Sequence, residues 1–252
     1  MALRKALSKH EAEICRVAGL LAERGWAEAN GGNLSIRLET SFDPIGERFP
    51  LSIPRPELEG HSLLLTTTGS RMRDLAENPL ENLCLVRIVD SGSSFLAESE
   101  GGEVTSEFPT HLAVHALLVM ERPDHHALLH THPTFLIALT HLVKDKAELR
   151  DTLIRMFPEA ALLLHDNLEV LDYITPGSDE LGAATVEAIR RVCGVIWRGH
   201  GMLASGANLS CALDLVEVAE KAARIALLLG DSRKECGLSD DQLKGIYEAF
   251  GD

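Results

Sequence analysis

The apolar residues near the start of the chain recur at the spacing of an α-helix. Ile14, Val17 and Leu21 stand three and four positions apart, and Gly25 ends the pattern. Ser8 and Glu11 have the spacing of a capping box, so we predict a helix over residues 9–24. Similar patterns predict helices over residues 109–120, from about 133, over 146–157, from TPGSDE to about 192, over 209–229, and a last one capped by Ser239 and Gln242.

Short apolar or β-branched runs between turn-forming residues predict strands. These runs are residues 34–38, 62–68, 83–89, 95–98, 127–132, 160–164, 169–174 and 194–197. The sequence DSGSS joins the third run to the fourth, which predicts an antiparallel hairpin. Residues 39–61 contain four prolines without clear periodicity, and we expect a long surface loop there.

Composition limits the class of protein. A chain of 252 residues that is 45% hydrophobic can bury a large core, and we expect a single domain over residues 1–252. A formal net charge of -14 argues against nucleic acid or an anionic membrane as partners. Five cysteines without a CxxC pair, an N-terminus without an uninterrupted apolar core, and no apolar run long enough to span a bilayer indicate a reduced, cytoplasmic protein.

Two histidines in the run ALLHTHP are candidates for metal ligands. Alternate residues of a strand point to the same face, so His130 and His132 would reach one point in space. A catalytic zinc usually takes three protein ligands, and the third must come from elsewhere. His200 follows the short strand 194–197, and strand ends commonly present functional side chains. A pair of solvated surface histidines is the alternative for His130 and His132.

Two glycine-containing turns could bind an anion. The first turn contains Asn30, Gly32 and Asn33, and the second, TTTGS, is followed by Arg71 and Arg73. Backbone N–H groups, hydroxyls and a guanidinium close together suit a phosphate or a carboxylate. Ordinary tight turns with solvated arginines explain the same residues.

Acidic and basic side chains also occur around the predicted helix 109–120. Glu107 lies near its start, where a carboxylate ordinarily complements the helix dipole. His111 and His115 are four residues apart and could form a second metal pair, but HLAVH lacks the glutamate of the HExxH motif. We therefore favour structural roles for these two histidines.

Seven motifs occur in an order that resembles the class II aldolase/adducin family: GWAEANGGNLSIRL, TTTGS, TSEFPTH, HTHP, PGSDELG, RGHG and AEKAA. The resemblance covers nearly the whole chain. It implies an α/β fold of three layers, α/β/α, with a central, largely antiparallel sheet. It also implies one Zn²⁺ bound by three histidines, and a homotetramer with sites between subunits.

Carried over position by position, the resemblance makes His130, His132 and His200 the zinc ligands and Glu107 the residue that moves a proton. Glu159 would enter the site of the neighbouring subunit. A larger set would line the phosphate and the substrate oxygens: Asn30, Gly32, Asn33, Thr68, Gly69, Ser70, Thr105 and Ser106. Arg71 stands where the family pattern has a second glycine, so the phosphate turn is expected to be remodelled.

The implied reaction is cleavage of a ketose 1-phosphate to dihydroxyacetone phosphate and a short aldehyde, with L-rhamnulose 1-phosphate and L-lactaldehyde as the leading pair. Other activities in the family are fuculose-phosphate cleavage, pentulose-phosphate epimerisation and methylthioribulose-phosphate dehydration. The family's epimerases carry aspartate at the position of Glu107, which argues against that choice. A noncatalytic adducin-like assembly module is a further alternative, but such modules lose the ligands that this chain retains.

Overall fold

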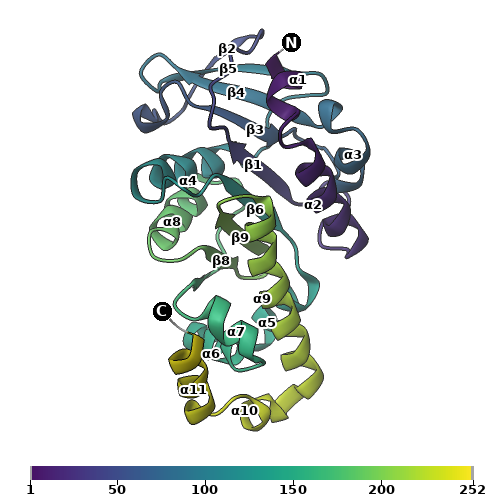
Figure 1. Cartoon of the computed structure of the whole chain (residues 1–252), viewed down its shortest axis with the longest axis vertical. Coiled ribbons are helices and arrows are strands. Elements are labelled where there is room, and N and C mark those ends of the chain that lie inside the picture. The colour runs from purple at the N-terminus through teal and green to yellow at the C-terminus, as the bar shows by residue number, and fades with distance from the viewer. Residues whose placement is uncertain (1, 251–252) are drawn as a thin grey trace.

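A computed structural model describes residues 2–250 and contains one nine-stranded mixed sheet (Figure 1). The strand order is β2-β5-β4-β3-β1-β6-β9-β8-β7. Neighbouring strands are antiparallel except β7 and β8, which confirms the prediction of a largely antiparallel sheet. The strands are β1 (Asn33–Arg37), β2 (Arg48–Pro50), β3 (Ser62–Thr66), β4 (Leu83–Val89), β5 (Ser94–Ser99), β6 (Ala127–Thr131), β7 (Leu168–Leu171), β8 (Gly194–Trp197) and β9 (Gly201–Gly206).

Helices cover both faces of the sheet, which confirms the predicted three-layer α/β/α class. Figure 1 shows α4 and α8 together on one side, and the long α9 with α2 on the other. The helices are α1 (Ala2–Leu7), α2 (Glu11–Glu23), α3 (Met72–Glu77), α4 (Phe108–Glu121), α5 (Thr134–Leu142), α6 (Lys146–Ile154), α7 (Pro158–Leu164), α8 (Asp179–Ile189), α9 (Leu209–Leu229), α10 (Arg233–Cys236) and α11 (Asp240–Phe250).

The alternation of side chains in the central strands separates two buried layers. Leu34 and Ile36 of β1 pack into the large core under α2, α5 and α9. Ser35, between them, faces α4 instead, where it contacts His111. In β6, Leu129 belongs to the α9 side and Leu128 to the α4 and α8 side. His130 follows Leu128 by two positions and therefore lies on the α4 side of the sheet.

Several helix ends have the caps that their sequences predict. The Asn208 side chain accepts a hydrogen bond from the N–H of Cys211 at the start of α9, at 2.9 Å. Ser239 and Gln242 form a reciprocal capping box ahead of α11. Side-chain caps satisfy backbone donors that a helix start leaves free, which is why these residues mark helix boundaries in the sequence.

Four local predictions were wrong. Residues 160–164 belong to α7 rather than to a strand, because Pro158 opens a helical turn and the following alanines and leucines favour helix. The helix predicted over residues 9–24 is present as α2, but the predicted capping box is absent, because α1 lies ahead of α2 and His10, not Ser8, precedes its first residue. The predicted loop 39–61 contains the short edge strand β2. Residues 201–206, for which no strand was predicted, form β9.

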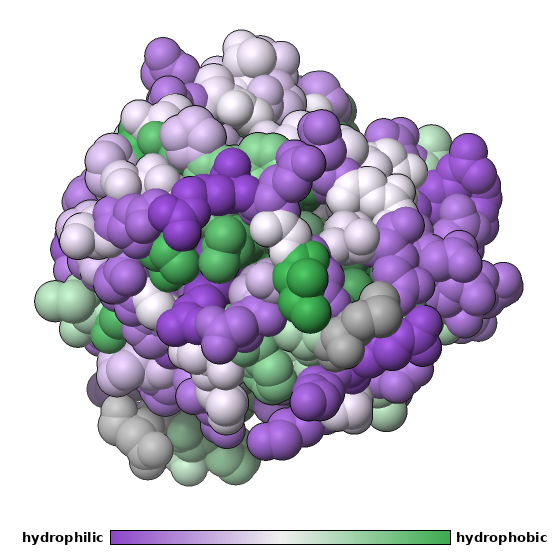
Figure 2. Space-filling model, turned by 90° about the horizontal axis from the view of Figure 1, so that it is seen from above, coloured by the Kyte–Doolittle hydropathy of each residue, from purple (hydrophilic) through white to green (hydrophobic). Residues whose placement is uncertain are grey.

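The surface is mixed in character. Figure 2 shows hydrophilic residues over much of the face seen from above, with small hydrophobic groups between them. Within residues 2–250, no helix has both the length and the apolar character needed to cross a bilayer.

Candidate metal centre and its surroundings

Strand direction brings distant parts of the chain together at one end of the sheet. β1 is antiparallel to both β3 and β6, so the start of β1 lies beside the ends of those two strands. Asn33 pairs with His130 across β1 and β6, and Thr131 pairs with Met202 across β6 and β9. The turns around Gly32 and Gly69 and the turn that carries His200 therefore meet at this end.

Three histidine side chains converge there. His130, His132 and His200 each offer a ring nitrogen, and these three atoms lie within 4.8 Å of one another. The Nε2 atoms of His130 and His132 are 3.2 Å apart. A tetrahedral zinc with bonds of about 2.0–2.1 Å separates its nitrogen ligands by about 3.4 Å. The spacing of the His130 and His132 nitrogens therefore fits a metal ion, and the His200 nitrogen lies within 4.8 Å of them.

The hydrogen bonds of His130 and His132 leave their Nε2 atoms available to a metal. His130 Nδ1 donates to the Met202 carbonyl at 3.1 Å, and His132 Nδ1 donates to the carboxylate of Glu28 at 3.0 Å. In the neutral rings, both Nε2 lone pairs then face each other without a hydrogen, and a cation between them removes that repulsion.

Burial favours the neutral, metal-binding form of two of these rings. Desolvation lowers the pKa of His130 well below its usual value, with contributions from His132 and His200. Desolvation also lowers the pKa of His200, although the nearby Glu107 carboxylate acts in the opposite direction. A histidine must be unprotonated to bind a metal, so these shifts leave His130 and His200 able to bind one at neutral pH.

Glu107 faces the histidines rather than the start of its helix. It occupies the residue before α4 but makes no side-chain cap hydrogen bond. The side chain is buried, with Oε2 at 3.8 Å from His130 Nε2 and Oε1 at 3.9 Å from His200 Nε2. Asn33 Nδ2 donates to Oε2 at 2.9 Å. The carboxylate is therefore placed beside the candidate metal position and not simply at the helix dipole.

Trp197 is buried and packs against two of the three histidines, a contact that the sequence analysis did not predict. Its ring lies 4.5 Å from that of His130 and 5.2 Å from that of His200, measured between centroids. Its indole N–H donates to Thr185 Oγ1 at 3.1 Å, which fixes the ring from the α8 side. The only indication of this contact in the sequence was the position of Trp197 at the end of β8, three residues before His200.

Most of the predicted site residues line one pocket with the three histidines. Gly31 and Thr67 line it as well, although neither was predicted. The pocket residues are Asn30, Gly31, Gly32, Asn33, Thr67, Thr68, Gly69, Ser70, Thr105, Ser106, Glu107, His130, His132 and His200.

Two predicted residues are not among those that line this pocket. Arg71 is exposed at the start of α3 and lies 3.9 Å from Asp74 in a loose ion pair. Glu159 is exposed in the first turn of α7. A role for Glu159 in a neighbouring subunit's site stays a prediction.

Glycine is required where the backbone approaches the histidines. A Cβ atom on Gly201 would lie 2.4 Å from the Thr131 carbonyl oxygen and 3.0 Å from the His132 ring. Gly32 has a φ of +75°, and a Cβ there would lie 3.1 Å from the His130 carbonyl oxygen. These two positions explain why the motifs around the ligands contain glycine.

Glu220 of α9 holds the segment that follows the histidine strand. Its buried carboxylate accepts hydrogen bonds from the backbone N–H groups of Phe135 and Leu136, at 3.0 and 2.7 Å. These are free donors in the first turn of α5, directly after His132 and Pro133. The AEKAA motif that contains Glu220 therefore anchors the chain where it leaves the site.

His111 and His115 do not join the metal cluster. Both are fully buried on α4, and both rings contact Ser35 Oγ, at 2.7 and 2.8 Å. His111 also contacts Asn33 Oδ1 at 2.5 Å. These hydrogen bonds are typical of the structural role that was favoured for the two histidines.

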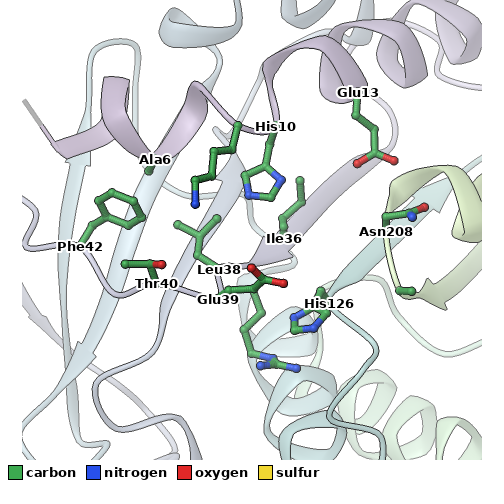
Figure 3. Close-up of a pocket in the computed structure, with 13 residues that line it drawn as sticks. Ala6, His10, Glu13, Ile36, Leu38, Glu39, Thr40, Phe42, His126 and Asn208 are labelled. Carbon is green, nitrogen blue, oxygen red and sulfur yellow. The ribbon is translucent and has the colours of Figure 1, made fainter.

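A second pocket lies at the opposite end of β1. Figure 3 shows Ile36 with His10, Glu13, Glu39 and His126 around it. None of the predicted site residues lines this pocket, and its acidic and basic groups are mixed. It is separate from the histidine cluster and does not alter the choice of candidate site.

Comparisons with known proteins agree with this geometry. Residues 12–227 match the family described as Class II Aldolase and Adducin N-terminal domain. A rhamnulose-1-phosphate aldolase from Bacteroides thetaiotaomicron is 34% identical over 98% of this chain and 96% of its own length. A rhamnulose-1-phosphate aldolase from Listeria welshimeri is 31% identical, over 94% of this chain and 90% of its own length.

The solved structures agree as well. The crystal structure of a sugar-phosphate aldolase from Thermotoga maritima superimposes with a TM-score of 0.80 at 34% identity, covering 88% of this chain and 95% of that protein. An ordered set of matching motifs, a shared fold and a family match over most of the chain thus coincide. The protein belongs to the class II aldolase and adducin family.

Proposed function

We propose that this chain is a zinc-dependent aldolase that cleaves L-rhamnulose 1-phosphate to dihydroxyacetone phosphate and L-lactaldehyde. The observation that carries the proposal is the buried carboxylate of Glu107 beside three convergent histidines. Relatives named aldolases over nearly the whole chain confirm the predicted enzyme class, a lyase of the class II type, and support cleavage of a ketose 1-phosphate.

His130, His132 and His200 would hold the metal. Three neutral imidazoles suit zinc and leave a coordination position open for substrate. A bound zinc would act as a Lewis acid on the ketone and withdraw the negative charge left when the adjacent carbon–carbon bond breaks. The hydrogen bonds to Met202 and Glu28 keep the His130 and His132 rings aimed at that position.

The two glycine-containing turns would bind the phosphate. Thr68 and Ser70 supply hydroxyl groups, and Asn30 supplies an amide, all on the wall of the histidine pocket. Because the protein carries a net charge of -14, an anionic substrate needs such local donors. Arg71 is exposed and does not line this pocket, so the proposed donors to the phosphate are uncharged groups rather than a guanidinium.

Glu107 would carry the proton. Its Oε2 is engaged by Asn33, whereas Oε1 points toward His200 at 3.9 Å from Nε2. We assign the proton transfer to Oε1, because both oxygens face histidine nitrogens but only Oε2 is already hydrogen-bonded to Asn33. A carboxylate within reach of the reacting carbon can take up a proton during one step and return it in the next.

We also propose that the enzyme works as a homotetramer in which Glu159 reaches the site of a neighbouring copy. Glu159 is exposed on α7, and Leu162 and Leu163 of the same helix are 38% and 41% exposed. Apolar side chains beside an exposed carboxylate fit a surface that another copy covers. Light scattering would test the tetramer, and a monomer with full activity would exclude it.

A coupled assay for dihydroxyacetone phosphate tests the proposed reaction. The zinc-loaded protein would be given L-rhamnulose 1-phosphate, L-fuculose 1-phosphate and L-ribulose 5-phosphate in parallel. We expect the highest kcat/KM with L-rhamnulose 1-phosphate. A preference for fuculose 1-phosphate would change the substrate but keep the reaction class, whereas epimerised product without dihydroxyacetone phosphate would refute aldol cleavage.

A further inference from the structure

A chain of hydrogen bonds runs from Glu107 into the layer between the sheet and α4. Glu107 Oε2 accepts from Asn33 Nδ2 at 2.9 Å, and Asn33 Oδ1 contacts His111 Nε2 at 2.5 Å. His111 Nδ1 then contacts Ser35 Oγ at 2.7 Å, and Ser35 Oγ contacts His115 Nε2 at 2.8 Å. All five side chains are buried, so water does not compete for these bonds.

The contact in which the Glu107 carboxylate accepts from Asn33 sets the direction of the other bonds in this chain. A carboxylate only accepts, so the amide nitrogen of Asn33 must face Glu107, and the amide oxygen must face His111. That oxygen in turn accepts, so His111 Nε2 must carry a hydrogen. The reversed amide would place Asn33 Oδ1 against the Glu107 carboxylate, with two acceptors and no hydrogen between them.

The direction continues through the histidine rings. Burial lowers the pKa of His111 to about 4, so the ring is neutral and its Nδ1 is an acceptor. Ser35 must therefore donate its only hydrogen to His111, and its oxygen accepts from His115 Nε2. His115 Nδ1 is then a bare nitrogen, and it has no hydrogen-bond partner among the described residues.

We infer that His111 is a positioning residue that, with Ser35, fixes the Asn33 amide so that its nitrogen holds Glu107 Oε2 and leaves Oε1 for proton transfer. This inference rests on the proposed role of Glu107. It also changes the predicted role of Asn33, because its amide oxygen and one amide hydrogen are already used within the chain. Asn33 should therefore act mainly on turnover and less on phosphate affinity.

Substitution of His111 tests this role against a purely structural one. In His111→Leu, Asn33 loses its fixed orientation, and we expect kcat to fall roughly 10- to 100-fold while KM for the ketose phosphate changes less than about threefold. His111→Gln retains a donor toward Asn33 and should recover most of the activity. Zinc content and the thermal unfolding midpoint would be measured for each variant.

His115→Leu is the matched control. His115 lies on the same helix and is equally buried, but it lies beyond the bonds that orient Asn33. We expect its kcat within about threefold of wild type, even if its unfolding midpoint falls as far as that of His111→Leu. Equal losses of kcat in the two leucine variants, or wild-type kcat in His111→Leu, would overturn the inference.

Neutron diffraction of the deuterated wild-type protein provides a test that requires neither activity nor a variant. We expect deuterium on His111 Nε2 and on Ser35 Oγ toward His111, with none on His111 Nδ1. Deuterium on Nδ1 would overturn the inference even if the variants fail to fold. If the deuterium positions are as expected but Glu107→Gln leaves turnover unchanged, then the proposed function of Glu107 fails while the orientation of Asn33 stands.

Discussion

Replacing Glu107 by glutamine removes an ionisable group with almost no change in shape. The side chain is 9% exposed, and its two oxygens lie 3.8 and 3.9 Å from histidine nitrogens. An amide can still accept the hydrogen bond from Asn33, so the expected loss of unfolding free energy is only about 1 kcal/mol. Turnover should fall about 100-fold or more, because an amide cannot take up the proton.

These two magnitudes can be separated experimentally. A factor of about 100 corresponds to about 2.7 kcal/mol of activation free energy, whereas a loss of about 1 kcal/mol in stability leaves a typical domain folded. The assay is exchange of solvent hydrogen into dihydroxyacetone phosphate, which isolates the proton transfer from release of the aldehyde. Zinc content and unfolding midpoint serve as controls. Exchange at the wild-type rate in the zinc-loaded Glu107→Gln protein would refute the assignment.

Other predictions follow from the same geometry. His200→Ala should lose stoichiometric zinc and activity; retention of one zinc per chain in metal analysis would remove His200 from the site. In steady-state kinetics, Ser70→Ala should raise KM for the phosphorylated ketose with little effect on kcat. An unchanged KM would show that Ser70 does not bind the phosphate. Since the pKa of His111 is lowered from 6.5 to about 4, the unfolded chain binds this proton first as the pH falls. Unfolding free energy should then decrease by about 3 kcal/mol between pH 6.5 and 4, and His111→Gln should reduce that slope in denaturant titrations.

The sequence predicted the structure best where the spacing of neighbouring residues alone determines a helix boundary or the direction of a side chain. The spacing of His130 and His132 predicted two rings on one strand face, and their Nε2 atoms are 3.2 Å apart. The long helix over residues 209–229 was predicted with its observed ends, because an asparagine cap and a regular apolar period mark it. Such signals depend only on neighbouring positions in the chain.

The features that were missed depend on tertiary structure. Residues 160–164 form an unbroken apolar run that fits a buried strand or a buried helix, and packing against α9 decides between them. The contact of Trp197 with two histidines requires the β8–β9 hairpin, and β9 itself was not predicted. Asn33 was expected at the phosphate, and its bonds to Glu107 and His111 could not be foreseen from residues that lie more than seventy positions away.

The division of the histidines between β6 and the turn before β9 has a consequence for how the protein folds. The Nδ1 atom of His130 bonds to Met202, which is 72 positions further along the chain. Closing so long a loop is slow and entropically costly, and contacts of this range form late in folding. The unfolded chain can therefore offer a metal only the neighbouring pair His130 and His132.

A metal ion bound by all three histidines should then stabilise the native protein without accelerating its folding. A metal present at 100 times its dissociation constant, and bound by the native state alone, adds about 2.7 kcal/mol to the free energy of unfolding. Since we expect the third ligand to join after the transition state, nearly all of this gain should appear as slower unfolding. Chelation would shorten the lifetime of the folded enzyme while leaving its refolding rate unchanged.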